Sequence, residues 1–464
     1  MLTESQCRKI IDFALACGQK LASKKKPLAI EVSLTGTNVA TSRFANNEMT
    51  QNQAPSANYL SVRVLKSGRQ ARLDSLDLSS AGIEAMVKSA VKACDLLEAE
   101  DDLLPLPTAA KKSQSTSAVD RYHPPTVKLT ALDRAREIGK IIALAEAGKV
   151  SAAGVYSSGE NFNAIGNSNG LFRYYRETSA ECSITVTDDG ATSWVKAQSP
   201  RYGEVDGALL AERAIAKAHL ARHPQDLTPG RYTAILEPAA VLDLLTYLWW
   251  DFSGTSHVDK LSCLLEKVGE KVFGDNITIV DDVGSAMQCG CPFDGEGVTR
   301  QSINLVDKGV VSALVHSRQS AQRLRNSTHA KTESTGHSLA QPSAMGEMPL
   351  NLVIEGGISS IEEMIQQVQG DQEAVLLTRV WYVREVDGAT KLLTGMTRDG
   401  TFLVKDGAIV QPVRNLRFNV SLIDLLNNVI ALGPSIRTAG VEGFPAIVPA
   451  MMVKNFNFTE GTRF

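Results

Sequence analysis

Hydrophobic residues in the first half of the chain recur at two different spacings. Apolar positions at three- and four-residue steps predict helices over 4–22, 80–97, 129–147 and 207–220. Runs in which apolar and polar residues alternate predict strands over 29–34, 39–44, 59–65, 150–156, 161–167, 171–187 and 193–198. A Thr-Gly-Thr-Asn stretch at 35–38 predicts a turn between the first two strands. Helices that alternate with groups of strands in this way indicate an α+β fold.

The most apolar segment of the chain runs from Glu237 to Gly254, directly after a short apolar strand. Pro238 is placed where a first helical turn tolerates proline, and Gly254 is placed where a helix ends. One face of this predicted helix is apolar throughout, at positions Val241, Leu244, Leu245, Leu248 and Trp249. We therefore expect one buried helix at the centre of its domain.

Beyond residue 229 the pattern changes to short strands separated by Asp-Gly turns, at 387–388, 399–400 and 406–407. Strands at this spacing predict a barrel-like or curled sheet. We expect an α+β region over 1–228 and a β-rich domain over 229–464. A polar, proline-containing stretch at 100–126 suggests a further boundary inside the first region.

Composition narrows the possible functions. A formal net charge of −3 offers no basic surface for nucleic acid, so we expect no direct nucleic-acid partner. No apolar run approaches the roughly 18 residues of a membrane span, and the N-terminus lacks the zones of a signal peptide. Seven scattered cysteines are typical of reduced thiols. These features predict a cytoplasmic protein.

Two groups of residues could carry chemistry. Cys289 and Cys291 resemble half of a metal or redox site, but no second ligand pair follows at zinc-finger spacing. Asp294 and Glu296 could act as an acid–base pair, or could accept backbone hydrogen bonds in a tight turn. For both groups, a purely structural role is favoured over a catalytic or metal-binding one.

A polar stretch at 324–348 has little periodicity and is long for a connection inside a compact domain. It could bind an extended peptide beside a strand edge, or could be an ordinary loop. The histidines in and before this stretch could also be plain surface or hydrogen-bonded residues.

Several stretches carry a resemblance to a known family. They are Ser-Cys-Leu-Leu-Glu-Lys-Val-Gly at 262–269, Pro-Phe-Asp-Gly-Glu-Gly-Val at 292–298, Asp-Lys-Gly-Val-Val at 307–311 and Ser-Thr-Gly-His at 334–337. Their order resembles the TldD/PmbA family, whose paired subunits form a bacterial metalloprotease also described as a modulator of DNA gyrase.

The resemblance implies that TldD-type subunits carry His-Glu-x-x-x-His on the helix after the apolar strand. In this sequence the motif falls near Thr246, Tyr247 and Asp251, none of which matches. No Cys follows Cys291 to supply the family's third ligand. The chain therefore resembles the PmbA (TldE) type. We expect no metal in this chain, and zinc in a TldD-type partner.

The resemblance further implies a non-catalytic subunit that helps to bind peptide substrates, paired with a TldD-type subunit or with a second copy of itself. The residues expected to contact the peptide are His316, Arg318, His329, Thr335 and His337. The alternative is a self-sufficient peptidase or hydrolase that uses Cys289 or Cys291 with His337, Asp294 or Glu296. No residue supports direct binding to DNA gyrase.

Overall fold

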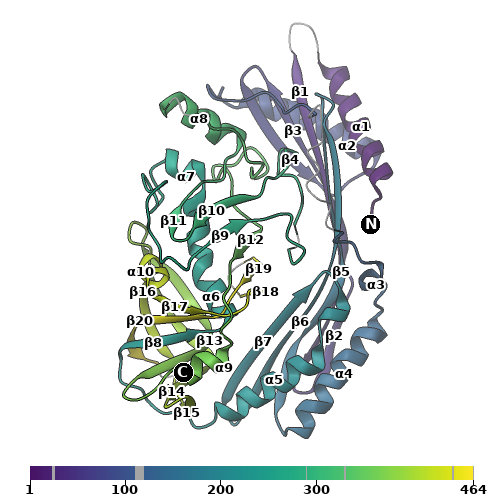
Figure 1. The fold of residues 1–464 in the computed structure, drawn as a ribbon. Coiled ribbons are helices and arrows are strands. Elements are labelled where there is room, and N and C mark those ends of the chain that lie inside the picture. The colour runs from purple at the N-terminus through teal and green to yellow at the C-terminus, as the bar shows by residue number, and fades with distance from the viewer. Residues whose placement is uncertain (23–26, 110–119, 289, 329–330, 442–443, 463–464) are drawn as a thin grey trace.

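The computed structural model describes residues 1–22, 27–109, 120–288, 290–328, 331–441 and 444–462. It confirms the α+β class, because helices pack against antiparallel sheets in the N-terminal half and a barrel forms in the C-terminal half (Figure 1). Within the described residues, no helix combines the length and the apolarity needed to cross a bilayer.

The N-terminal half is built on one antiparallel sheet in the order β4-β3-β1-β5-β6-β7, with β2 paired to β1. Its strands are β1 (Leu28–Ala45), β2 (Glu48–Gln53), β3 (Ser56–Lys66), β4 (Arg69–Ser75), β5 (Ser151–Asn167), β6 (Phe172–Asp188) and β7 (Ala191–Ser199). Because β1 pairs with β5 along fourteen residues, this sheet extends across the boundary suggested at 100–126.

The turn predicted at 35–38 is wrong, since β1 passes through it as one continuous strand. Gly36 pairs with Asn58 on one side and with Phe162 on the other, so its backbone is held by two neighbours. An added Cβ at Gly36 would lie only 2.1 Å from the Phe162 ring. The glycine thus allows an aromatic ring to cross the strand, and sheet pairing outweighs the local turn preference.

Two groups of helices cover separate ends of this long sheet (Figure 1). The helices are α1 (Glu4–Leu21), α2 (Ser80–Leu96), α3 (Pro124–Val127), α4 (Ala131–Ala147), a 3-10 turn η1 (Tyr202–Glu204) and α5 (Gly207–Leu220). One core forms under α1 and α2 around Ile11 and Val87, and another under α4 and α5 around Ile141 and Ala214.

In the C-terminal half, β13, β8, β20, β16 and β14 close into a five-stranded barrel, with β15 and β17 attached to it. A second sheet has the order β11-β10-β9-β12-β19-β18. The strands are β8 (Gly230–Leu236), β9 (Ile279–Asp281), β10 (Ile303–Asp307), β11 (Val310–Val311), β12 (Leu352–Ile354), β13 (Glu373–Asp387), β14 (Leu392–Lys405), β15 (Ala408–Pro412), β16 (Leu416–Ser421), β17 (Val429–Leu432), β18 (Ile436–Thr438), β19 (Ala446–Val448) and β20 (Met451–Gly461).

The helix expected over 237–254 is present but divided. It forms as α6 (Pro238–Leu245), a 3-10 segment η2 (Thr246–Phe252) and α7 (Gly254–Val258). All five predicted core positions are buried, and α6 packs between the barrel and the second sheet (Figure 1). The remaining helices are α8 (Arg318–Thr328), α9 (Ile361–Gln366) and α10 (Leu422–Asn427). The Thr246–Asp251 stretch lies within η2.

Candidate functional site

A cavity of about 700 Å³ opens at the end of α6 and contains all three positions at which the metal motif would fall. Thr246, Tyr247 and Asp251 line it together with aromatic, sulfur-containing and charged side chains. Those that matter below are Trp250, Leu261, Met345, Glu385, Lys391 and Phe444. This mixture of apolar walls and a few charges is typical of a ligand pocket.

Lys391 is the positive charge of this cavity. Its Nζ lies 2.7 Å from Asp251 Oδ2 and donates a 2.7 Å hydrogen bond to Glu385 Oε2. Only 5% of Lys391 and 2% of Asp251 are exposed. Burial alone lowers the pKa of Lys391, but the charges and hydrogen bonds of Asp251 and Glu385 outweigh it and raise that pKa. Lys391 therefore stays protonated at neutral pH.

The residues at the motif positions do not fit a zinc ion. The Tyr247 hydroxyl already donates a 2.7 Å hydrogen bond to the Val383 carbonyl. Asp251 binds the Lys391 ammonium through Oδ2 and accepts the Cys263 N–H at 2.8 Å through Oδ1. Thr246 offers only a neutral hydroxyl, whereas zinc prefers thiolate, imidazole and carboxylate. Among the described residues, no cluster of three or more His, Cys, Asp or Glu side chains could hold a metal ion.

A second cavity of about 410 Å³ adjoins the first, and the two share Thr255, Asp259 and Ala344 in their walls. Its far end is lined by Gln70 and Glu100 of the N-terminal half. The two cavities therefore lie side by side, and together they are called here the Lys391 groove, which reaches from the end of α6 to the N-terminal half.

Three of the residues predicted to contact peptide lie together in the interior rather than in this groove. Thr335 Oγ1 accepts the His316 backbone N–H at 2.8 Å and lies 2.9 Å from His337 Nδ1. His337 is fully buried, and its Nε2 lies 3.2 Å from Asp281 Oδ1. Burial lowers the pKa of His316 to about 4, although the nearby Glu347 carboxylate opposes the shift. In these positions, His316, Thr335 and His337 hold loops together in the interior.

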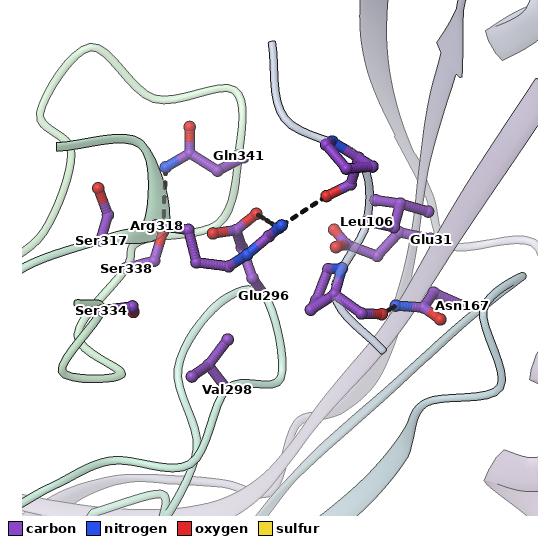
Figure 2. A network of polar contacts seen from close by, with 12 residues as sticks. Glu31, Leu106, Asn167, Glu296, Val298, Ser317, Arg318, Ser334, Ser338 and Gln341 are labelled. Atoms are coloured by element: carbon purple, nitrogen blue, oxygen red, sulfur yellow. Dashed lines mark hydrogen bonds and ion pairs between the residues drawn. The ribbon is translucent and has the colours of Figure 1, made fainter. Parts of the chain in front are cut away.

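Arg318 lies between the two halves of the molecule (Figure 2). It forms a 3.3 Å ion pair with Glu296 and donates a 2.6 Å hydrogen bond to the Pro105 carbonyl. Glu296 also pairs with Arg63 at 3.5 Å, and Arg63 in turn lies 3.6 Å from Glu31 on β1. These contacts tie the loop at 292–298 to the N-terminal sheet. His329 lies outside the described residues.

Asp294, by contrast, is held by backbone groups of its own loop and of the segment that carries Ser338. Its carboxylate accepts backbone N–H bonds from Glu296 and Val298, both at 2.9 Å, and from Ser338 at 3.0 Å. Burial and the charge of Glu296 raise the pKa of Asp294 to about 7. Burial also raises the pKa of Cys291 to about 12, which disfavours a thiolate nucleophile. Cys289 lies outside the described residues.

Sequence reasoning missed Lys391 and Glu385. Both flank the Asp-Gly turn at 387–388, which the sequence does predict, but nothing local shows that this hairpin returns to Asp251. Their opposite charges, six residues apart across that turn, were the one available signal for a pair.

Comparisons with known proteins agree with this architecture. Metalloprotease PmbA of Escherichia coli O157:H7 is 24% identical over 475 aligned residues, which cover 96% of this chain and 96% of that protein. The structure of TldE from Thermococcus kodakarensis superposes with a TM-score of 0.81 at 18% identity, over 97% of this chain and all of that one. A Thermotoga maritima protein, solved as a candidate modulator of a DNA gyrase, gives a TM-score of 0.83 at 18% identity, with the same coverage.

Family models give the firmest assignment. The model of the PmbA/TldA metallopeptidase central domain matches residues 122–222, and that of the C-terminal domain matches residues 229–460. Since these matches together span well over half of the chain, the protein belongs to the PmbA/TldD metallopeptidase family.

Proposed function

We propose that this chain is the metal-free, PmbA (TldE)-like subunit of a TldD-type metalloprotease and helps to bind unfolded polypeptide for its partner. The observation that carries the proposal is the Lys391 ammonium, which pairs with Asp251 in the cavity formed by the motif positions. In this chain a protein cation is present where the TldD-type motif would place a metal ion.

Electrostatic repulsion explains why the Lys391 ammonium and a zinc ion cannot both bind Asp251. Two like charges about 4 Å apart repel by roughly 4 kcal/mol at an effective dielectric of about 20, and a dication doubles that figure. Asp251 and Lys391 are both almost fully buried, so solvent screens little of this repulsion. A zinc ion would have to displace Lys391 from a pair that already satisfies its charge.

The shape of the Lys391 groove supports a role in binding peptide. Its walls combine apolar side chains with Thr255, Ser256 and Gln341, which offer hydrogen bonds to an extended backbone. A groove with these two features suits an extended polypeptide backbone.

The test compares the purified chain with its complex with a TldD-type protein. After incubation with zinc and dialysis, we expect less than stoichiometric zinc and no peptidase activity on an unfolded polypeptide for the chain alone. The complex should hold zinc and degrade the polypeptide, and replacing the partner's first motif histidine should abolish both properties.

Stoichiometric zinc and activity in the isolated chain would refute the proposal and favour a self-sufficient hydrolase. A stable homodimer that neither binds zinc nor pairs with a TldD-type protein would refute the partner assignment alone. Size-exclusion chromatography with light scattering separates these two outcomes.

A further inference from the structure

We infer that the Lys391 groove selects extended polypeptide segments in which a large apolar side chain is flanked by basic residues. This inference rests on the proposed function and adds the class of substrate to it. It follows from the charges that line the groove, the exposed apolar side chains among its lining residues and the adjacency of its two cavities.

The end of the groove at α6 keeps one unbalanced negative charge. Asp251 and Glu385 share the single ammonium of Lys391, each at 2.7 Å. Asp251 is buried behind that ammonium, whereas the Glu385 side chain is 37% exposed. The surplus charge therefore reaches the groove through Glu385, where an incoming ammonium or guanidinium group can approach it.

The other end of the groove is also acidic. Arg323 pairs with Asp259 at 2.9 Å and lies 3.9 Å from Asp102, so its positive charge is already matched. Glu100 accepts a 2.7 Å hydrogen bond from the neutral amide of Gln70, and within the described residues it forms no ion pair. Of the charged side chains that line the two cavities, four are acidic and two are basic.

Exposed apolar side chains also line the larger cavity, beside Glu385. Leu261 is 75% exposed, Phe444 is 60% exposed and Met345 is 54% exposed. Trp250 and Tyr247 line the same cavity. Exposed apolar groups gathered round a cavity mark a surface that is covered by a ligand, and a space of about 700 Å³ accommodates a leucine- or aromatic-sized side chain.

Charge complementarity identifies the occupant. An acidic or neutral segment would leave the surplus charges of Glu385 and Glu100 uncompensated, and an acidic segment would be repelled by both. A basic segment neutralises both ends while its apolar residue covers Leu261 and Phe444. Because Glu385 and Glu100 line different cavities that meet at Thr255, Asp259 and Ala344, a ligand that reaches both acids has to extend past these shared residues.

Fluorescence anisotropy of labelled peptides with the full-length purified chain tests this inference. Three peptides share a central Phe, and its neighbours are Lys, Gln or Glu. We expect the Lys peptide to bind about tenfold more tightly than the Gln peptide, and the Glu peptide to bind least tightly. Added salt should reduce this difference, because the contacts at Glu385 and Glu100 are partly exposed to solvent.

Substitutions in the groove show which residues cause the preference for the Lys peptide. Glu385→Gln and Glu100→Gln should each reduce the preference for Lys over Gln by about threefold, while Glu48→Gln, on the exposed strand β2, should leave it unchanged. Leu261→Ser should weaken the binding of all three peptides by a similar factor. Leu96→Ser, at a position on α2 that is 86% exposed, serves as the control and should leave their binding unchanged.

Equal affinity for the three peptides, or a preference that Glu385→Gln and Glu100→Gln leave intact, overturns the inference. Concentration-dependent dimerisation that Leu261→Ser abolishes, without peptide binding, would show that a second copy covers the groove and would also overturn it. Neither result changes the zinc and partner assays of the proposed function, so the two failures can be distinguished.

Discussion

Replacing Lys391 with Met removes the ammonium of the groove and keeps an unbranched apolar side chain of similar length. Asp251 then loses its cationic partner, while the 2.8 Å hydrogen bond from the Cys263 N–H to its carboxylate remains. The carboxylate is buried, and removing one member of a buried ion pair costs about 3–5 kcal/mol of unfolding free energy. For a region the size of the C-terminal half, this corresponds to a fall in Tm of about 10 °C.

A matched substitution at an exposed ion pair shows whether the loss of stability comes from the buried charge or from removing a lysine in general. Lys405→Met breaks the 3.2 Å pair of Lys405 with Glu373, in which both side chains are more than a third exposed. Exposed pairs contribute up to about 1 kcal/mol, so Tm should fall by no more than about 3 °C. Adding Asp251→Asn to Lys391→Met should recover part of the loss, because it removes the unpaired buried charge.

Thermal and urea unfolding followed by circular dichroism measure these differences. Both variants are measured at pH 8 beside the unaltered chain. Equal Tm values for Lys391→Met and Lys405→Met at pH 8 would refute the assignment of a buried charge pair.

Three further outcomes follow from other parts of the molecule. Trp249→Ala, at a core position only 1% exposed, should destabilise by about 3–5 kcal/mol, and the exposed Leu96→Ala by less than about 0.5 kcal/mol, as denaturant titration will show. Because the folded-state pKa of His316 lies below its usual 6.5, its contribution is complete above that pH and is lost as pH falls toward 4. His316→Gln should therefore flatten the stability profile between those values, and an unchanged slope would contradict this reasoning. Arg318→Ala breaks the contacts to Glu296 and Pro105, and it should speed limited proteolysis between the two halves without lowering the helix content.

The sequence determined the elements whose signals are local. Apolar spacing located the five core positions of α6 and η2, all of which are buried. Asp-Gly turns located two hairpins of the barrel, at 387–388 after Glu385 and at 406–407. The turn predicted at 399–400 is wrong, because Asp399 and Gly400 lie inside the continuous strand β14, where pairing with β13 outweighs the local turn preference. The same local reasoning failed at Gly36, because two neighbouring strands supplied hydrogen bonds that no short stretch of sequence displays.

Tertiary structure alone decided the candidate site. Lys391 meets Asp251 across 140 positions of sequence, and Glu296 meets Arg63 across 233. The sequence could show that Thr246, Tyr247 and Asp251 do not match His-Glu-x-x-x-His. It could not show that an ammonium pairs with Asp251, because ion pairs depend on distance in space, and the barrel that brings β13 and β14 back to η2 sets that distance.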